Sequence, residues 1–457
     1  MSGRACLAVL IALLATACGD ALAPGDGGSS FGRIQSRIFD SRCVDCHSAG
    51  TDDAARSGLI LTRGRAFEAL VGAQPRYNTA RAGGLQRVMA GKPDSSFLLH
   101  KLHLEPDHHT PDYGMSMPLG GRPLSVGQVE YIRRWIAAGA SRTGDTIDTR
   151  LLSDSTSQSL VAFVPPTPPL MGVQLRVDRF DVAPRFEREL FVYRRLGNSA
   201  PMYVNRVDIA MRANSHHFVM YTFQPEIPLA VVPPFDSIRD IRRPDGSMDF
   251  LAMRPMGFHL FFGGSMTAKT TWQLPAGVAL RLPAGAALDL NAHYVNRTDA
   301  QLPGEVYANL FAVDSAAVSN VAQSLFLSNT NIALPPGQRT TLSKTFTFSQ
   351  DVRVFMLSSH MHERGERFVV RINGGPRSGE LVFETNSWSS PDIANFAVPI
   401  QLRAGEGLRS EITWNNATAN TIRFGLTSQD EMGIIFGYYW CEVACGPNPV
   451  SLAASDR

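Results

Sequence analysis

The chain has 457 residues, of which 44% are hydrophobic and 18% are charged, and its formal net charge is +2. This length exceeds that of one compact domain and fits about three domains of roughly 100–200 residues each. The near-neutral charge argues against a nucleic-acid partner and against electrostatic attraction to an anionic membrane.

The start of the chain predicts an export signal. Arg4 precedes an apolar run at 5–15, which is far shorter than the ~20 residues that span a bilayer. The following LATAC resembles a bacterial lipobox, in which Cys18 becomes the lipidated first residue; alternatively, its A-x-A pattern is a cleavage site that releases a soluble protein. We favour a lipoprotein with a signal at 1–17 and a flexible tether at 18–30. We therefore expect the bacterial periplasm or cell envelope, with membrane contact only through the lipid.

Residues 31–143 are expected to form a small all-α domain. Helical periodicity is present in IQSRIFDSRCVDCH and SSFLLHKLHL, and LSVGQVEYIRRWIAAGA is strongly amphipathic. We expect Ser125 to cap this last helix and Gly139 to end it. The polar and proline-rich composition of 144–170 predicts a linker.

Within this helical region, Cys43-Val-Asp-Cys46-His47 has the C-x-x-C-H pattern of covalent haem attachment. The two thiols would bond to the haem, and His47 would ligate its iron. The region is similar to class I cytochrome c domains, in which a Met-Pro pair precedes the last helix, so Met117 is the expected sixth ligand. Alternatives are Met115 and a bis-histidine arrangement drawn from His100, His103, His108 and His109. We therefore expect one covalent haem c in a cytochrome c domain.

From residue 171 onward, the pattern changes to short alternating segments punctuated by Pro and Gly, as in KTFTFSQDVRVFMLSSHMH. Such segments predict β-strands. About 275 residues of this kind are too many for one β-sandwich, so we expect two all-β sandwich domains, at 171–328 and 329–457. Export permits a disulfide between Cys441 and Cys445, although a free pair is an open alternative.

Six candidate metal ligands lie in these two domains. The first set comprises His216 and His217 in NSHHFVMY and His293 in LNAHYVN. The second set comprises His360 and His362 in SSHMHERG and Met432 in QDEMGIIFGYYW. Imidazole suits several metals, but a thioether added to two imidazoles favours copper, especially Cu(I). The chain therefore predicts two copper sites.

Strand geometry limits how these ligands can converge. His360 and His362 are two residues apart, so on a strand both side chains face the same way. His216 and His217 are adjacent, and a regular strand would point them to opposite faces. They can share a metal only at a strand end, at a bulge or through different ring nitrogens.

The order and spacing of the six ligands resemble those of the copper type II, ascorbate-dependent monooxygenases, the family of peptidylglycine α-hydroxylating monooxygenase and dopamine β-monooxygenase. HHFVMY matches the family's histidine pair, AHY its third histidine, HMHERG its H-x-H motif and DEMGIIFGYY its methionine segment, so the resemblance spans about 171–445. It implies two jelly-roll-like sandwiches with one copper on each facing wall of a solvent-filled cleft. It further implies that copper on the catalytic His360, His362 and Met432 serves O₂ and substrate, while the other copper stores the second electron.

Departures from the family pattern narrow the substrate. Gly433 stands where the family has a cysteine. The peptide-hydroxylating members bind the substrate carboxylate with an arginine, an asparagine and a tyrosine, and the matching positions here hold Ser358, Ile434 and Phe436. A buried carboxylate would lack its charged partner. We therefore expect a small organic substrate that is more apolar than a peptide terminus.

These features predict an exported copper-dependent monooxygenase that hydroxylates a C–H bond with O₂. Its electron donor would be an ascorbate-like reductant or a redox protein, and the attached haem would pass the electrons on, because tethering raises the effective concentration of the donor. Two other hypotheses remain open. One is a non-enzymatic haem and copper electron-transfer or copper-binding lipoprotein, and the other is a β-sandwich binding module with incidental histidines.

Overall fold

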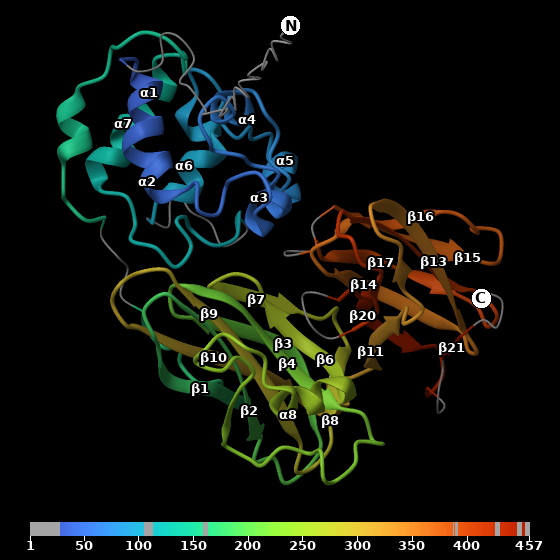
Figure 1. Ribbon diagram of the computed structural model, residues 1–457. Coiled ribbons are helices and arrows are strands. Elements are labelled where there is room, and N and C mark those ends of the chain that lie inside the picture. The colour runs from blue at the N-terminus through green and yellow to red at the C-terminus, as the bar shows by residue number, and fades with distance from the viewer. Residues whose placement is uncertain are drawn as a thin grey trace, which may run out of the picture.

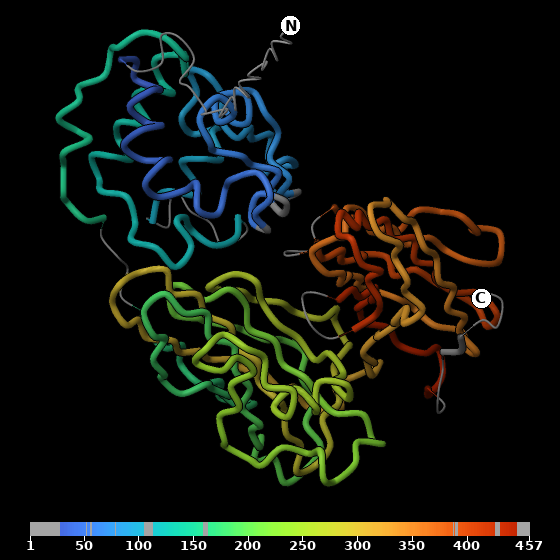
Figure 2. Tube along the Cα trace, viewed as in Figure 1, coloured from blue at the N-terminus to red at the C-terminus, as the bar shows by residue number. Residues whose placement is uncertain are grey.

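The computed structural model describes residues 28–104, 113–158, 163–386, 388, 392–425, 430–445 and 450–452. The predicted signal, Cys18, most of the tether and the pair His108 and His109 lie outside these residues. Figure 1 shows three lobes: a helical lobe at the top left, a first β lobe below it and a second β lobe at the right. The Cα trace in Figure 2 follows the chain through them in that order. Within the described part, every helix is too short or too polar to span a bilayer.

The helical lobe consists of short helices around one long one. Its elements are α1 (Ser30–Ile34), η1 (Gln35–Phe39), α2 (Asp40–Arg42), α3 (Asp52–Ser57), α4 (Ala66–Leu70), α5 (Asn78–Ala82), η2 (Pro93–Ser95), α6 (Phe97–Leu102), α7 (Val126–Ala137) and η4 (Thr149–Ser153). The start of α7 is the predicted one, because Ser125 and Gln128 form a reciprocal capping box. Gly139 follows the helix with a φ of 98°, as expected of a C-terminal glycine.

The core of this lobe lies between α7 and the first helices. Trp135 of α7 packs against Phe31 of α1, with ring centroids 5.4 Å apart. The first part of the predicted linker is also packed, because Leu151 and Leu152 contact this core and the Gln158 amide donates to the carbonyls of two residues in it. The segment from the end of α7 to 158 thus belongs structurally to the helical lobe.

The first β lobe is a sandwich of antiparallel sheets. Its elements are β1 (Gly172–Val182), β2 (Phe186–Arg195), β3 (Met202–Met211), β4 (Ser215–Phe223), β5 (Ile238–Asp240), α8 (Phe250–Met253), η5 (Arg254–Phe258), β6 (His259–Ser265), β7 (Lys269–Gln273), β8 (Val278–Leu282), β9 (Ala287–Asn296), β10 (Leu302–Val313) and η6 (Ser315–Ala317). One sheet has the order β5-β2-β9-β4-β6, and the other contains β1-β10-β3-β8 with β7 beside β3. Alternate residues such as Leu190, Phe218 and Leu290 fill the core between the sheets.

The second β lobe repeats this arrangement. Its strands are β11 (Asn320–Ser328), β12 (Ala333–Leu334), β13 (Gln338–Phe348), β14 (Val352–Met361), β15 (Gly365–Asn373), β16 (Leu381–Thr385), β17 (Ala394–Leu402), β18 (Gly407–Asn416), β19 (Ile422–Arg423), β20 (Gly433–Cys441) and β21 (Val450–Leu452). The sheet β16-β15-β18-β13-β21 packs on β11-β20-β14-β17. After β20, Cys441 and Cys445 form a disulfide, which decides between the two alternatives that the sequence left open.

The two β lobes are joined directly. β11 pairs with β20 of its own lobe and, in parallel, with β8 of the first lobe, so one sheet runs through both. The hydroxyl of Tyr438 on β20 donates to the carbonyl of Phe262 on β6. The protein is therefore a mostly β protein with a small N-terminal helical region and antiparallel sheets packed as sandwiches, as the sequence predicted. The predicted boundary at 328 falls at the end of the shared strand β11 and stays a prediction.

Candidate metal centres

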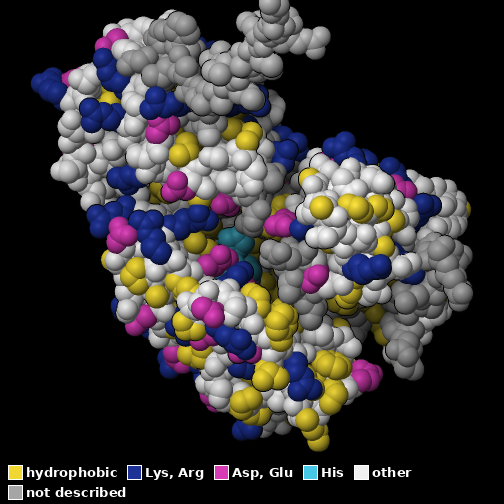
Figure 3. All heavy atoms as spheres, in the orientation of Figure 1, with side chains coloured by type: hydrophobic (Ala, Val, Ile, Leu, Met, Phe, Trp, Pro, Cys, Tyr) yellow, Lys and Arg dark blue, Asp and Glu magenta, His cyan; other side chains and the backbone are white. Residues whose placement is uncertain are grey.

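The three histidines of the first set meet at the end of β4 and β9. His217 lies directly opposite His293, and the register shifts between Ser215 and His217, so His216 is the extra residue of a β-bulge. The bulge allows adjacent histidines to face one side, which is one of the three arrangements that the sequence permitted. Ligand nitrogens of the three histidines all lie within 4.8 Å of one another. Figure 3 shows histidine side chains in the hollow between the lobes.

Hydrogen bonds select which nitrogen of each ring can bind a metal. Nε2 of His217 donates to the Asn291 carbonyl oxygen at 2.7 Å, and Nε2 of His293 donates to Glu187 Oε1 at 2.6 Å. Both rings are left with a lone pair on Nδ1. Nδ1 of His216 lies 3.2 Å from Nδ1 of His217, and the buried Nδ1 of His293 has no hydrogen-bond partner among the described residues. The converging Nδ1 atoms therefore fit a metal ion such as copper.

Two glutamates on β2 border this triad. The hydrogen bond from His293 holds the pKa of Glu187 at about 2, against the effect of burial. Burial acts to raise the pKa of Glu189, but the neighbouring His293 and His217 outweigh it and lower that pKa. Both groups are thus carboxylates, and their negative charge favours a cation at the triad. Neither glutamate was among the predicted site residues, although their two-residue spacing in FERELF places them on one face of a strand.

A buried polar cluster around Asp289 lies next to the triad, on the same face of β9. Asp289 is completely buried and accepts from Nε2 of His259 at 2.9 Å and from Nη2 of Arg239 at 2.6 Å. Tyr221 stacks on His259 with ring centroids 4.3 Å apart. The ring of His259 on β6 is thus fixed beside Asp289, which shares a face of β9 with Asn291, and it lies outside the metal triad.

The second set lies where the paired strands β14 and β20 end and begin. His360 on β14 lies opposite Ile434 on β20, and Met361 lies opposite Gly433. The ladder ends at this pair, and His362 and Met432 are the residues directly after β14 and directly before β20. Met361 is buried in the core, so His360 faces the other side of the sheet. The ring centroids of His360 and His362 are 5.0 Å apart.

The segment before Met432 fixes His362. Nδ1 of His362 donates to the Asp430 carbonyl at 3.0 Å, which leaves Nε2 for a metal. The completely buried Glu431 accepts three hydrogen bonds, from the backbone N–H of His362 and Arg364 and from Trp414 Nε1, at 3.0, 2.9 and 2.8 Å. Burial raises the pKa of Glu431 to about 7. Glu431 was not among the predicted site residues, although its place directly before the candidate ligand Met432 was a signal for it in the sequence.

The two ligand sets are close enough to influence each other. Burial, together with the charges of His362 and His217, lowers the pKa of His360 to about 3. His217 belongs to the other set, so the two sets are close enough for the charge of one to act on the other. This proximity was implied by the family resemblance and not by any local feature of the sequence.

An apolar wall adjoins the second set. The ring of Phe436 lies 6.3 Å from that of His360 and 5.2 and 5.5 Å from those of Phe261 and Phe326. Ser358 lies opposite Phe436, and its hydroxyl donates to the Asp392 carbonyl at 2.9 Å. The residues at the family's carboxylate-binding positions thus place aromatic carbon beside His360 and no cationic side chain.

The C-x-x-C-H segment forms one turn after α2. His47 N–H donates to the Cys43 carbonyl at 2.9 Å, and its ring Nδ1 bonds to the Leu59 carbonyl at 3.2 Å, which leaves Nε2 available for iron. A cavity of about 1120 Å³ adjoins this turn, and its lining includes Cys43, Cys46, His47, Met115 and Met117. The free thiols, the oriented imidazole and the cavity fit a covalent haem.

The lining of this cavity distinguishes between the candidates for the sixth haem ligand. Met115 and Met117 both line it, whereas His100 and His103 are not among its lining residues. Lys101 supports the methionine segment, because its Nζ donates to the carbonyls of Tyr113 and Met115. Burial lowers the pKa of Lys101 to about 7. Met117 stays the predicted ligand, and the placement of His108 and His109 lies outside the described residues.

Comparisons with known proteins add little to this geometry. No family model matches the chain, and no curated protein matches it. Among solved structures, VP54 of the virus PBCV-1, fitted into the virophage Sputnik, is 7% identical over 64% of this chain and 99% of its own, with a TM-score of 0.22. A triple jelly-roll protein of an archaeal virus is 8% identical over 60% of each chain, with a TM-score of 0.18, and PNGF-II is 8% identical over 66% and 71%, with a TM-score of 0.21. Likeness at this level carries no functional argument.

Proposed function

We propose that this protein is an exported copper-dependent monooxygenase that hydroxylates a C–H bond of a small, largely apolar organic substrate. The overall reaction consumes R–H, O₂, two electrons and two protons and yields R–OH and water. One covalent haem c would pass on electrons from an ascorbate-like reductant or a redox protein. The predicted lipid on Cys18 would hold the protein at the bacterial cell envelope.

The observation that carries this proposal is the pair of unlike ligand sets on neighbouring walls. In one set, ligand nitrogens of three histidines lie within 4.8 Å of one another. In the other, the rings of His360 and His362 are in contact, and Met432 directly precedes the strand that pairs with β14. Copper bound there would supply one-electron redox chemistry and reactivity toward O₂. An electron-transfer protein needs one such site, whereas a two-electron hydroxylation has a use for both.

The chain's own residues would hold the ligands in place. Asn291 and Glu187 fix the rings of His217 and His293 through their Nε2 atoms. The Asp430 carbonyl fixes His362 in the opposite sense, with Nε2 outward. Such partners set the tautomer of each imidazole and raise its basicity as a ligand.

The substrate would lie against the aromatic wall beside His360. Phe436, Phe261 and Phe326 offer apolar surface there. Each buried methylene of a substrate gains about 0.8 kcal/mol in such surroundings, whereas a carboxylate there would lose its hydration without a cationic partner. We therefore propose a neutral substrate with an apolar body.

The experiment is metal analysis combined with O₂ consumption in the mature holoprotein. We expect two coppers and one covalent haem per chain, and O₂ uptake coupled to a hydroxylated product in a screen of apolar compounds. Met432→Leu should lower copper content toward one and reduce O₂ uptake by more than about 100-fold, because an outer partner alone accounts for 10–100-fold. Met202→Leu on β3, which packs against the first core, is the matched control and should change neither.

Other outcomes would overturn the proposal in distinct ways. One haem without copper would leave a cytochrome carried by a binding scaffold. Two coppers without substrate-dependent O₂ uptake would leave the electron-transfer lipoprotein. Equal O₂ uptake in the Met432→Leu and Met202→Leu variants would remove the second ligand set from the reaction.

A further inference from the structure

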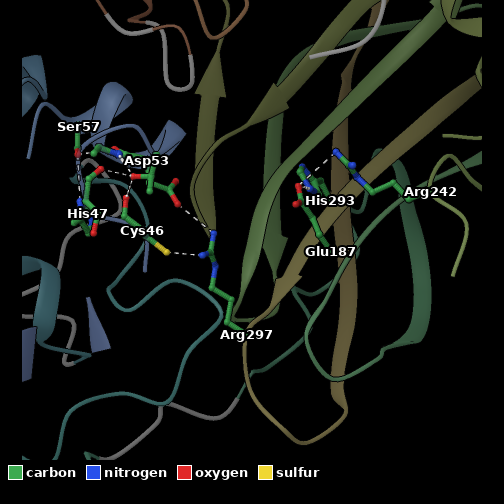
Figure 4. A network of polar contacts seen from close by, with 11 residues as sticks. Cys46, His47, Asp53, Ser57, Glu187, Arg242, His293 and Arg297 are labelled. Atoms are coloured by element: carbon green, nitrogen blue, oxygen red, sulfur yellow. Dashed lines mark hydrogen bonds and ion pairs between the residues drawn. The ribbon is translucent and has the colours of Figure 1, made fainter. Parts of the chain in front are cut away.

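The helical lobe touches the first β lobe at one end of β9. Just past this strand, Arg297 reaches into the helical lobe, where its Nη1 contacts Cys46 Sγ and its Nη2 lies 3.2 Å from Asp53 Oδ2. Figure 4 shows Arg297 between these residues of the helical lobe and the pair formed by His293 and Glu187. The side chain thus touches the sulfur to which a haem would be bonded.

The loop that follows Met117 makes a second contact with the same strand end. Arg297 N–H donates to the Gly120 carbonyl at 2.8 Å. Gly120 has a φ of 68°, and a Cβ there would lie only 2.5 Å from the Val295 carbonyl oxygen. Only glycine allows the two backbones to approach so closely. Both predicted axial segments of the haem, at His47 and at Met117, therefore adjoin one short stretch of β9.

Charges of opposite sign face each other around this contact. Asp53 of the helical lobe pairs with Arg297, and the charges of Asp45 and Arg122 in that lobe act on Arg185 and Asp299 of the β lobe respectively. Arg185 and Asp299 also pair with each other at 2.9 Å. Alternating charges of this kind fix the register of two docked surfaces.

The same strand leads directly to the histidine triad. His293 is three residues before Asn296, the last residue of β9, and an extended strand covers that span in about 10 Å. The cavity beside the C-x-x-C-H turn also extends between the lobes, and its lining includes His47, Met117, Val295, Arg297 and His216. The haem site and the triad therefore share both a strand and a cavity.

We propose that electrons pass from the haem to copper through this contact, which we call the electron port. They reach the His216, His217 and His293 site rather than the His360, His362 and Met432 site. The inference rests on the proposed function for its haem and its two coppers. With haem and copper bound, one electron would pass per event from ferrous haem to Cu(II) on the triad, giving ferric haem and Cu(I) with no proton or bond transferred. The haem is reduced again by an external small reductant or redox protein.

The test follows the haem and needs no substrate. The oxidised holoprotein receives a sub-stoichiometric pulse of a one-electron reductant, and haem reoxidation is recorded from its visible absorption. We expect a rate independent of protein concentration that is retained in His360→Ala and lost in His293→Ala. Arg297→Glu places like charges at the contact and should slow reoxidation about tenfold, with a larger salt dependence. Arg339→Glu, an equal charge change at an exposed ion pair of the second β lobe, is the control and should retain the rate.

A double variant with the two charges exchanged distinguishes the loss of the ion pair from a folding defect. Asp53→Arg combined with Arg297→Glu restores an opposite-charge pair and should recover most of the lost rate. Hydrogen exchange gives a readout without electron transfer, since the segment around Gly120 should exchange faster in Arg297→Glu than in Arg339→Glu.

The outcomes separate this inference from the proposed function. Loss of reoxidation in His360→Ala with retention in His293→Ala would place the port at the other site and overturn the inference. An unchanged rate in Arg297→Glu, or a swap that recovers nothing, would also overturn it. Copper in both sites and rapid reoxidation without any hydroxylated product would support the port while refuting the monooxygenase. A triad that binds no copper would overturn both.

Discussion

Glu431 offers a sharp test of how the His362 and Met432 segment is held. It is fully buried and accepts three N–H donors, two at Oε2 and one at Oε1. Glutamine has the same shape but only one acceptor oxygen. In the better of its two orientations, the glutamine oxygen of Glu431→Gln accepts from His362 N–H and Trp414 Nε1. Its NH₂ group then faces the Arg364 N–H, which loses its acceptor.

The number of hydrogen bonds lost sets the expected decrease in the free energy of unfolding. One buried donor loses its partner, which costs about 1–3 kcal/mol. The hydrogen bonds from His362 N–H and Trp414 Nε1 remain, but a neutral amide then accepts them in place of a carboxyl group. We therefore expect Glu431→Gln to cost an amount in the upper half of this range. Glu411→Gln on β18 is the matched control, because Glu411 makes only partly exposed ion pairs at 3.6 Å with Arg371 and Arg409. Its removal should cost less than about 1 kcal/mol.

The assay is denaturant unfolding of the second β lobe, followed through tryptophan fluorescence, together with copper analysis. Glu431→Gln should lower the unfolding midpoint clearly more than Glu411→Gln does. It should also weaken copper binding at His362 and Met432, since Glu431 holds the backbone beside both, and leave the triad occupied. If the two variants unfolded at the same denaturant concentration and bound the same copper, the account of Glu431 as the anchor of this segment would be wrong.

Two further predictions concern the helical lobe. Ser125→Ala removes the N-cap of α7 and should lower the lobe's free energy of unfolding by about 1 kcal/mol, measured by circular dichroism against the exposed-site control Ser36→Ala. The hydrogen bond from Arg133 lowers the pKa of Glu130 to about 2, below its ordinary 4.5, so this carboxylate stabilises the fold above about pH 4.5 and loses that contribution as the pH falls toward 2. Glu130→Gln should therefore flatten the acid side of the stability profile by at most about 1 kcal/mol, because the pair is largely exposed; an identical acid profile would contradict this.

The ligand chemistry could be predicted from the sequence alone because it depends on residue type and on local spacing. C-x-x-C-H defines a haem attachment turn within five residues, and H-x-H places His360 and His362 on one face of any strand. The cap at Ser125 is equally local, since it needs only the next turn of the helix. The helix start is confirmed. His360 lies in β14 while His362 follows the end of that strand, so the shared strand face stays a prediction, and the bound metals and haem stay proposals.

Long-range pairing could not be predicted in this way. The bulge that turns His216 and His217 to one side exists because β4 slips by one residue against β9, and no residue of NSHHFVMY specifies that slip by itself. Glu187 became a partner of His293 only through the β2–β9 register. Residue order along one strand says nothing about which residue of another strand lies opposite.

The nature of the ligands and the metals that suit them thus follow from residue chemistry, which each short motif carries intact. The meeting of His216, His217 and His293, and the contact of Arg297 with Cys46, follow from how strands pair and lobes dock. Register is set by the total burial of apolar side chains across a whole sheet, because a one-residue slip would expose every core residue of the strand. That sum is spread over residues far apart in the chain, and only the folded molecule shows its result.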